Sequence, residues 1–144
     1  MKIDEISALW KADCGFDITD LATSASNVPL LHAKYYELFA LENMVLSKFQ
    51  CDYKVLYKTK LEYYSGRLSD EDRAEKGWDP MQLRVLKQDL DTYIEADLDI
   101  INFLLKLAVQ QEKVDYLKEI VKSLNNRGFL LRTAMDWVKF TQGC

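Results

Sequence analysis

Residues that stop helices are scarce in this sequence. Its 144 residues include only five glycines and two prolines, so a helix has to end at few positions. No segment has the strict alternation of apolar and polar residues that is typical of a strand. The sequence therefore predicts an all-α protein. At this length we expect one helical domain, residues 1–144, with a modest core.

Residues that bind metals or perform catalysis are also scarce. The three cysteines, Cys14, Cys51 and Cys144, are scattered, and His32 is the single histidine. A structural zinc site needs four such ligands at closer spacing, so we expect no metal site and reduced thiols. His32 has no evident acid or nucleophile partner, and no glycine-rich phosphate loop is present. We therefore expect a protein that is not an enzyme and needs no cofactor.

Long hydrophobic runs are absent too. No stretch approaches the roughly 20 apolar residues that span a bilayer, and the N-terminus has no signal-peptide core. With 49% hydrophobic and 29% charged residues, the composition is that of a folded protein rather than a disordered one. We expect a cytoplasmic protein that does not contact a membrane.

The charges are segregated along the chain. A net charge of −4 argues at first against nucleic acid. However, residues 48–67 and residues 118–139 each have a balance of +3, whereas residues 70–99 have a balance of −6. A polyanion responds to local charge, so the two basic segments remain candidates for contact with nucleic acid.

The acidic segment has several possible roles. Residues 70–99 could form a contact surface for another protein or a rim that repels one, and the residues do not decide between these. Four aspartates within the segment could in principle hold a cation, but their irregular spacing favours a solvated face. They are Asp89, Asp91, Asp97 and Asp99.

One long helix is predicted over residues 28–67. Pro29 suits a first helical turn, and Asn27 or Ser26 can cap it. The apolar stripe continues to Tyr64, which corresponds to roughly 55 Å at about 1.5 Å per residue. Gly66 suits the left-handed residue that follows a last turn. A helix of this length is expected to pack against another long helix or another subunit.

The remaining chain divides into a charged loop and C-terminal helices. Residues 68–79 are charged and predict a loop, and residues 80–142 predict the C-terminal helices. Asp79 and Pro80 favour a helix of about ten residues ending near Leu90. Gly128 either kinks or ends the last helix, and the sequence does not say which.

Rings and cations alternate at the end of the long helix. Residues at helical spacing share one face there, and two lysines and a leucine lie on a neighbouring face. Such a face can stack bases and neutralise phosphates without reading sequence. The alternative is that the tyrosines bury their rings in a bundle while the lysines are solvated. The first face has Tyr53, Tyr57, Lys60, Tyr64 and Arg67, and the second has Lys54, Lys58 and Leu61.

Two motifs resemble the UvsY family of T-even phage recombination mediators. The run KTKLEYYSGR, residues 58–67, is similar to the family's signature segment, and acidic residues 70–72 follow it. SLNNRGF at residues 123–129 and the ending FTQG at residues 140–143 are similar to the family's C-terminal region. The resemblance covers roughly residues 28–143.

The resemblance implies a function. Members of the family bind single-stranded DNA without sequence preference, form ring-like hexamers or heptamers, and help load the phage recombinase onto strands covered by single-strand-binding protein. It implies those three partners (single-stranded DNA, recombinase and single-strand-binding protein) and a location in the host cytoplasm. The two basic residues of the family motif correspond to Lys58 and Lys60. Lysine at position 60 keeps the charge of the family's arginine but lacks its planar fork. Our predicted DNA-binding residues are Lys58, Lys60, Arg67, Lys54, Tyr57 and Tyr64.

The C-terminal helices are expected to drive assembly. Residues 98–109 are apolar on nearly every side, which favours burial in a core or between subunits, and the resemblance implies the latter. The predicted fold is an extended helical bundle that assembles into a ring-like homo-oligomer. A helical protein–protein adaptor without DNA binding remains the alternative. The predicted oligomerisation residues are Ile101, Leu104, Leu105, Ala108, Leu117, Ile120 and Leu124.

Overall fold

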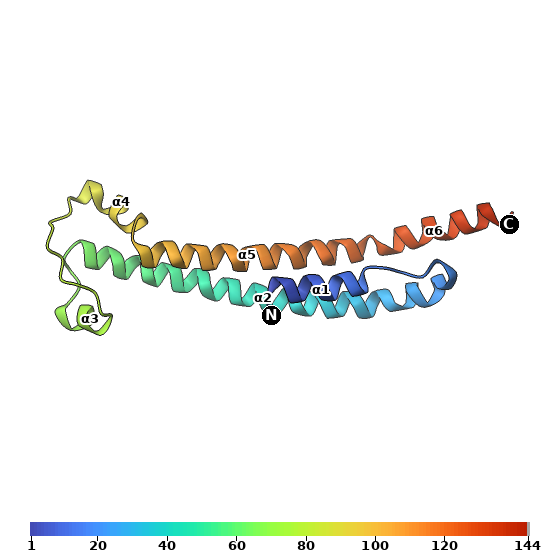
Figure 1. Ribbon diagram of the computed structural model, residues 1–144, viewed down its shortest axis with the longest axis horizontal. Coiled ribbons are helices and arrows are strands. Elements are labelled where there is room, and N and C mark those ends of the chain that lie inside the picture. The colour runs from blue at the N-terminus through green and yellow to red at the C-terminus, as the bar shows by residue number, and fades with distance from the viewer. Residues whose placement is uncertain (144) are drawn as a thin grey trace. The chain divides into compact units, whose positions relative to one another are not determined.

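The prediction of an all-α protein is confirmed. A computed structural model describes residues 1–143, and within that range it contains helices joined by turns and loops and no strand (Figure 1). No helix in this range is long and apolar enough to cross a membrane. The α-helices are α1 (Ile3–Asp13), α2 (Leu21–Tyr64), α3 (Asp70–Glu75), α4 (Leu90–Glu95), α5 (Leu98–Asn125) and α6 (Arg127–Thr141), with short 3-10 turns η1 (Ile18–Asp20) and η2 (Lys87–Asp89).

The chain forms two compact units. The first contains residues 1–44 and 111–143, and the second contains residues 45–110. In the first unit, α1 lies along the early part of α2 (Figure 1). The ring of Trp10 meets the ring of the fully buried Tyr35 edge-on, with centroids 5.4 Å apart. The buried core of this unit is Ile6, Tyr35, Leu117, Ile120 and Leu124.

Helix α2 begins at Leu21 rather than at the predicted residue 28. The side chain of Asp20 accepts a hydrogen bond from the Thr23 amide at 3.2 Å, which is the contact an N-cap makes. Pro29 therefore lies inside the helix. Its missing N–H leaves the carbonyl of Ala25 without its usual partner, and both residues are exposed, so water can satisfy that carbonyl.

The end of α2 follows the prediction for Gly66. This glycine has a φ of 78°, and its amide donates to the Tyr63 carbonyl at 3.2 Å. The Arg67 amide donates to the Glu62 carbonyl at 2.9 Å. These two bonds are the Schellman pattern, which satisfies the last carbonyls of a helix and turns the chain away from its axis.

The segment after α2 differs from the prediction in two places. Residues 70–75, expected in a loop, form α3, because Ser69 caps the Asp72 amide at 3.2 Å and three acids occupy the first turn. Residues 79–86, expected in a helix, have no helical structure. The hydroxyl of Tyr63 donates to the Asp79 carbonyl at 2.5 Å, and this tertiary contact holds the segment beside the end of α2.

Asn126 separates the last two helices. Its amide donates to the carbonyls of Lys122 and Ser123, at 3.3 and 3.2 Å, and α6 begins at the next residue. Gly128 lies within the first turn of α6, so it neither ends nor follows a helix. The interruption that the sequence suggested at Gly128 is therefore at Asn126.

Candidate nucleic-acid interface

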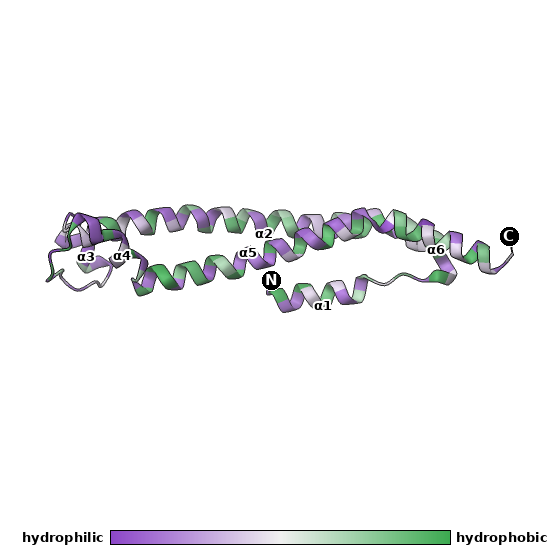
Figure 2. Ribbon diagram, turned by 90° about the horizontal axis from the view of Figure 1, so that it is seen from above, coloured by the Kyte–Doolittle hydropathy of each residue, from purple (hydrophilic) through white to green (hydrophobic). Residues whose placement is uncertain are grey.

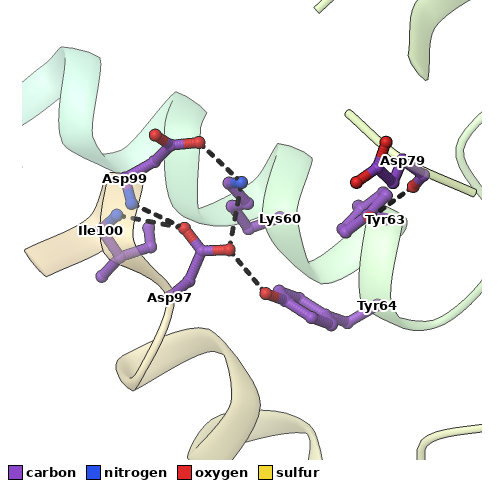
Figure 3. Close-up of polar contacts among 7 residues, drawn as sticks. All are labelled: Lys60, Tyr63, Tyr64, Asp79, Asp97, Asp99 and Ile100. Carbon is purple, nitrogen blue, oxygen red and sulfur yellow. Dashed lines mark hydrogen bonds and ion pairs between the residues drawn. The ribbon is translucent and has the colours of Figure 1, made fainter. Parts of the chain in front are cut away.

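Lys60 is buried by ion pairs and an aromatic ring. Its ammonium lies 2.9 Å from Oδ2 of Asp99 and 3.1 Å from Oδ2 of Asp97 (Figure 3). The same ammonium is 3.7 Å from the ring centroid of Trp78. Only 3% of the lysine is exposed. The charge of this predicted DNA-binding residue is thus compensated within the protein, and its contact with DNA stays a prediction.

Asp97 joins α2 to the start of α5. One carboxylate oxygen, Oδ1, accepts the Asp99 amide at 2.9 Å and so caps α5. The other, Oδ2, accepts from the hydroxyl of Tyr64 at 2.5 Å as well as from Lys60 (Figure 3). Burial opposes ionisation of this carboxyl, but the hydrogen bonds from Tyr64 and Lys60 outweigh it and lower its pKa.

The tyrosines in the C-terminal part of α2 contact other segments of the protein. Tyr57 donates to Asp91 at 3.1 Å, and the ring of Tyr53 lies 5.9 Å from that of Phe103 on α5. Burial and a hydrogen bond to an aspartate raise the pKa of Tyr57, and the same two causes raise that of Tyr64. These contacts fit the alternative interpretation, in which the tyrosine rings stabilise a bundle. Stacking of bases on Tyr57 and Tyr64 stays a prediction.

Three cations of the predicted site remain at the surface. Lys54 is exposed, and Lys58 has a 77% exposed side chain with Glu62 3.9 Å away. An exposed pair at that distance contributes little, so Lys58 can exchange it for a phosphate. Arg67 is exposed just after the helix, and its Nε donates to the Ser65 hydroxyl at 3.2 Å. The structure therefore leaves Lys54, Lys58 and Arg67 accessible to a polyanion.

The predicted oligomerisation residues fall into two groups. In the second unit, Ile101, Leu104, Leu105 and Ala108 on α5 are exposed, and Figure 2 shows the hydrophobic character of this part of the helix. Leu105 is 61% exposed. The remaining residues, Leu117, Ile120 and Leu124, belong to the core of the first unit and are at most 3% exposed.

In the second basic segment, residues 118–139, the central cation Arg127 is buried. Arg127 is 4% exposed, and its guanidinium donates to the Cys14 carbonyl at 2.7 Å and to the Gly15 carbonyl at 3.5 Å. The guanidinium also lies near the rings of Trp10 and Phe16. Arg127 therefore ties α6 to the segment after α1 instead of facing a ligand.

The aspartates between residues 89 and 99 are mostly engaged by side chains. Asp91, Asp97 and Asp99 accept from Tyr57, Tyr64 and Lys60, as described above. Across residues 1–143 no group of acidic, histidine or cysteine side chains is arranged to hold a metal ion. Asp97 and Asp99 are ion-pair partners of Lys60, whereas their spacing in the sequence favoured a solvated face over a cation site. Their charge, opposite to that of Lys60, is compatible with pairing. Their separation of more than 35 residues from Lys60 along the chain gave no indication of it.

A cavity of about 820 Å³ lies beside the end of α2. Arg67 lines it, together with Arg84 and Lys87 from the segment before α4. Neither Arg84 nor Lys87 was among the predicted site residues. They lie within residues 70–99, whose net charge is negative, so the charge balance of the segment did not indicate a basic site there.

Comparisons with known proteins agree over nearly the whole chain. The sequence family described as "Recombination, repair and ssDNA binding protein UvsY" matches residues 9–144. The recombination protein uvsY of Enterobacteria phage T4 is 25% identical over 143 residues, which cover 99% of each chain. Two crystal structures of the bacteriophage T4 recombination mediator protein UvsY share the fold. One has a TM-score of 0.84 at 23% identity and covers 97% of this chain and 99% of its own. The other has a TM-score of 0.85 at 22% identity and covers 99% and 98%.

Proposed function

This chain belongs to the UvsY family of recombination, repair and single-stranded DNA binding proteins, and from that membership we propose that it is a recombination mediator. In this proposal it binds single-stranded DNA without sequence preference. It then promotes loading of the phage recombinase onto strands covered by single-strand-binding protein. The relative from phage T4 is described as a recombination mediator, which supports the assignment.

The observation that carries DNA binding is the exposure of three cations at the end of α2. Lys54, Lys58 and Arg67 are accessible, while the buried Lys60 fixes the segment that bears them. Contacts of this kind neutralise phosphates and position a strand without reading its bases. A site with three cations is weak by itself, so repetition of the site is part of the proposal.

Self-assembly supplies that repetition. One chain exposes large apolar side chains on α5 and α6, including Leu105 at 61%, Trp137 at 63% and Phe140 at 78%. Large exposed apolar patches mark contact surfaces between proteins, and the proposal assigns these side chains to such patches. In a ring of identical subunits, the first DNA contact makes the later ones intramolecular, which raises the overall affinity. Such a ring would bend or wrap the strand, loosen the single-strand-binding protein and present the strand to the recombinase.

The test measures binding of a 20-nucleotide oligothymidine over a series of salt concentrations. Each phosphate that is neutralised on a single strand contributes about −0.7 to the slope of log K against log salt. The double variant Lys54→Ala with Lys58→Ala should flatten the slope by about 1.4 for each subunit that the oligonucleotide contacts, and it should weaken binding at least roughly tenfold. The matched control is Lys2→Ala with Lys11→Ala, which removes the same charge from exposed positions on or next to α1.

Three results would contradict the proposal or part of it. Absence of binding by the wild type at low salt would leave the protein–protein adaptor as the better function. If a monomer, identified by its mass in light scattering, bound DNA as tightly as the assembled protein does, repetition of the site would not raise the affinity. Equal losses in the double variant and in its control would move the DNA away from α2.

A further inference from the structure

The cavity beside the end of α2 has a wall of unusual charge. Its volume of about 820 Å³ is within the range of roughly 300–1,000 Å³ that is typical of ligand sites. Arg67, Arg84 and Lys87 line it, and no aspartate or glutamate does. Residues 80–88 contain only these last two charges, both positive, although acidic residues flank that segment on both sides. The cavity is therefore a local positive site within an acidic segment.

The three cations have no carboxylate partner. Within residues 1–143 no ion pair involves Arg67, Arg84 or Lys87. Lys60, by contrast, is compensated by two aspartates and does not line this cavity. An anion that enters the cavity would thus meet charges that are not already neutralised, and it would not have to displace a carboxylate to reach them.

The backbone of the cavity wall also offers donors. Residues 81–86 have no regular secondary structure. In the described chain, none of their amide N–H groups donates a hydrogen bond to a protein atom. Irregular segments of this kind commonly form ligand sites, and free backbone N–H groups are among the donors that bind phosphate oxygens. The wall can therefore supply both charge and hydrogen bonds to a phosphodiester.

The rest of the cavity lining is mixed, with polar residues such as Ser65 and Gln82 beside leucines. Leu61, Leu83 and Leu90 line it, and Leu83 is 68% exposed. The flat face of a nucleobase can pack against exposed aliphatic carbon and remove it from water. Cations and leucines in the same lining match the two parts of a nucleotide, its phosphate and its base.

We propose that this cavity holds a segment of single-stranded DNA, with its phosphates bound by Arg67, Arg84 and Lys87 and a base packed against Leu83. The proposal rests on the proposed function, because it places the strand that a mediator binds. It adds Arg84 and Lys87 to the binding residues and extends the contact from α2 to the segment before α4. The strand would then contact exposed cations that precede Gly66 in the sequence and others that follow it.

The experiment compares two double variants with the wild type. Arg84→Ala with Lys87→Ala should flatten the salt slope of oligothymidine binding by about 1.4 for each subunit that the oligonucleotide contacts, and it should weaken binding at least roughly tenfold. The charge-preserving exchange Arg84→Lys with Lys87→Arg should stay within about twofold of the wild type. Circular dichroism and light scattering show whether each variant keeps its helices and its assembly. The matched control is again Lys2→Ala with Lys11→Ala.

A crosslink gives an independent measurement. An oligonucleotide that contains 4-thiothymidine should crosslink to the wild-type protein within residues 81–90, as located by mass spectrometry. Leu83→Ala should reduce that crosslink severalfold while it leaves the salt slope unchanged, because leucine neutralises no phosphate. A crosslink found only elsewhere in the chain would overturn the proposal.

The remaining outcomes separate this inference from the mediator function. If the wild type binds the oligonucleotide and the cavity variant binds equally well, the cavity proposal is overturned and the mediator function stands. If the wild type does not bind, both are overturned. Thymidine monophosphate that competes at the same concentration as the oligonucleotide would assign the cavity to a free nucleotide. Competition by polyglutamate that abolishes the crosslink but leaves DNA affinity intact would assign it to an acidic peptide.

Discussion

The ammonium of Lys60 lies 3.7 Å from the ring centroid of Trp78 and 2.9 Å from the carboxylate of Asp99. The lysine comes from α2, the tryptophan from the loop after α3, and the aspartate from the first turn of α5. One cation thus connects three segments that are distant in sequence. We therefore expect Lys60 to contribute chiefly to stability and only indirectly to DNA binding.

Replacement of Lys60 should destabilise the protein. Lys60→Met removes a buried cation and leaves Asp97 and Asp99 facing each other, which should lower the free energy of unfolding by about 3 kcal/mol. Lys58→Met is the matched control on the same helix and should change it by less than about 0.5 kcal/mol, because that side chain is solvated. Urea unfolding measures both. Equal stability of the two variants would show that the ion pairs do not support the fold.

Stability should fall in acid through Asp97. Its pKa is lowered in the folded protein, so the stabilisation is complete above the unfolded pKa of about 3.9 and is lost as the pH falls through the folded value. Asp97→Asn should be less stable than the wild type at pH 6 and should lose less stability than the wild type between pH 5 and pH 3. Part of the acid dependence should persist, because hydrogen bonds from Lys34 and Tyr35 lower the pKa of Asp13.

The control for this measurement is Asp89→Asn, at an exposed position whose side chain makes no cap hydrogen bond. Its stability should depend on pH as that of the wild type does. If Asp97→Asn also keeps the full wild-type pH dependence, Asp97 is not the group that titrates with unfolding.

Arg127 should act as a structural residue. Arg127→Ala removes hydrogen bonds to the carbonyls of Cys14 and Gly15 and should cost about 2–3 kcal/mol of stability. Arg132→Ala, at an exposed position on the same helix, should cost less than about 0.5 kcal/mol. Thermal unfolding compares the two. Loss of DNA affinity in Arg127→Ala without any loss of stability would contradict the assignment.

Assembly and folding should respond to different leucines. Leu105→Asp places a charge on an exposed apolar face and should reduce the oligomer mass in light scattering while the helical signal is retained. Leu117→Ala opens a cavity in the core of the first unit and should cost about 2–5 kcal/mol of stability. An unchanged mass for Leu105→Asp would move the subunit contact away from this face of α5.

The helices could largely be predicted from sequence, whereas their ends depended on contacts between distant residues. The last turn of α2 was predictable, because Gly66 suits a left-handed position whatever lies around it. The loop at residues 79–86 was not, because Pro80 is compatible with a helix start and the contact between the Tyr63 hydroxyl and the Asp79 carbonyl joins residues that are distant in sequence. The start of α3 had a local signal, because Ser69 and the acids that follow it favour the beginning of a helix.

The site was harder to predict than the fold. Lysines and tyrosines at helical spacing identify a common face, but the sequence does not say whether that face meets solvent or another helix. Tyr57, Lys60 and Tyr64 contact aspartates that lie in α4, in α5 and between these two helices. Arg84 and Lys87 became relevant only when the fold placed them beside Arg67.

The bridge from Lys60 to Asp97 and Asp99 has a consequence for the integrity of the chain. It connects residues before the irregular segment 81–86 to residues after it, as do the ring contacts of Phe103 with Phe49 and Tyr53. A protease that nicked this segment would therefore produce two fragments that remain associated and co-purify. Expressed separately, the two fragments should reassemble, so the protein is suited to splitting at this position.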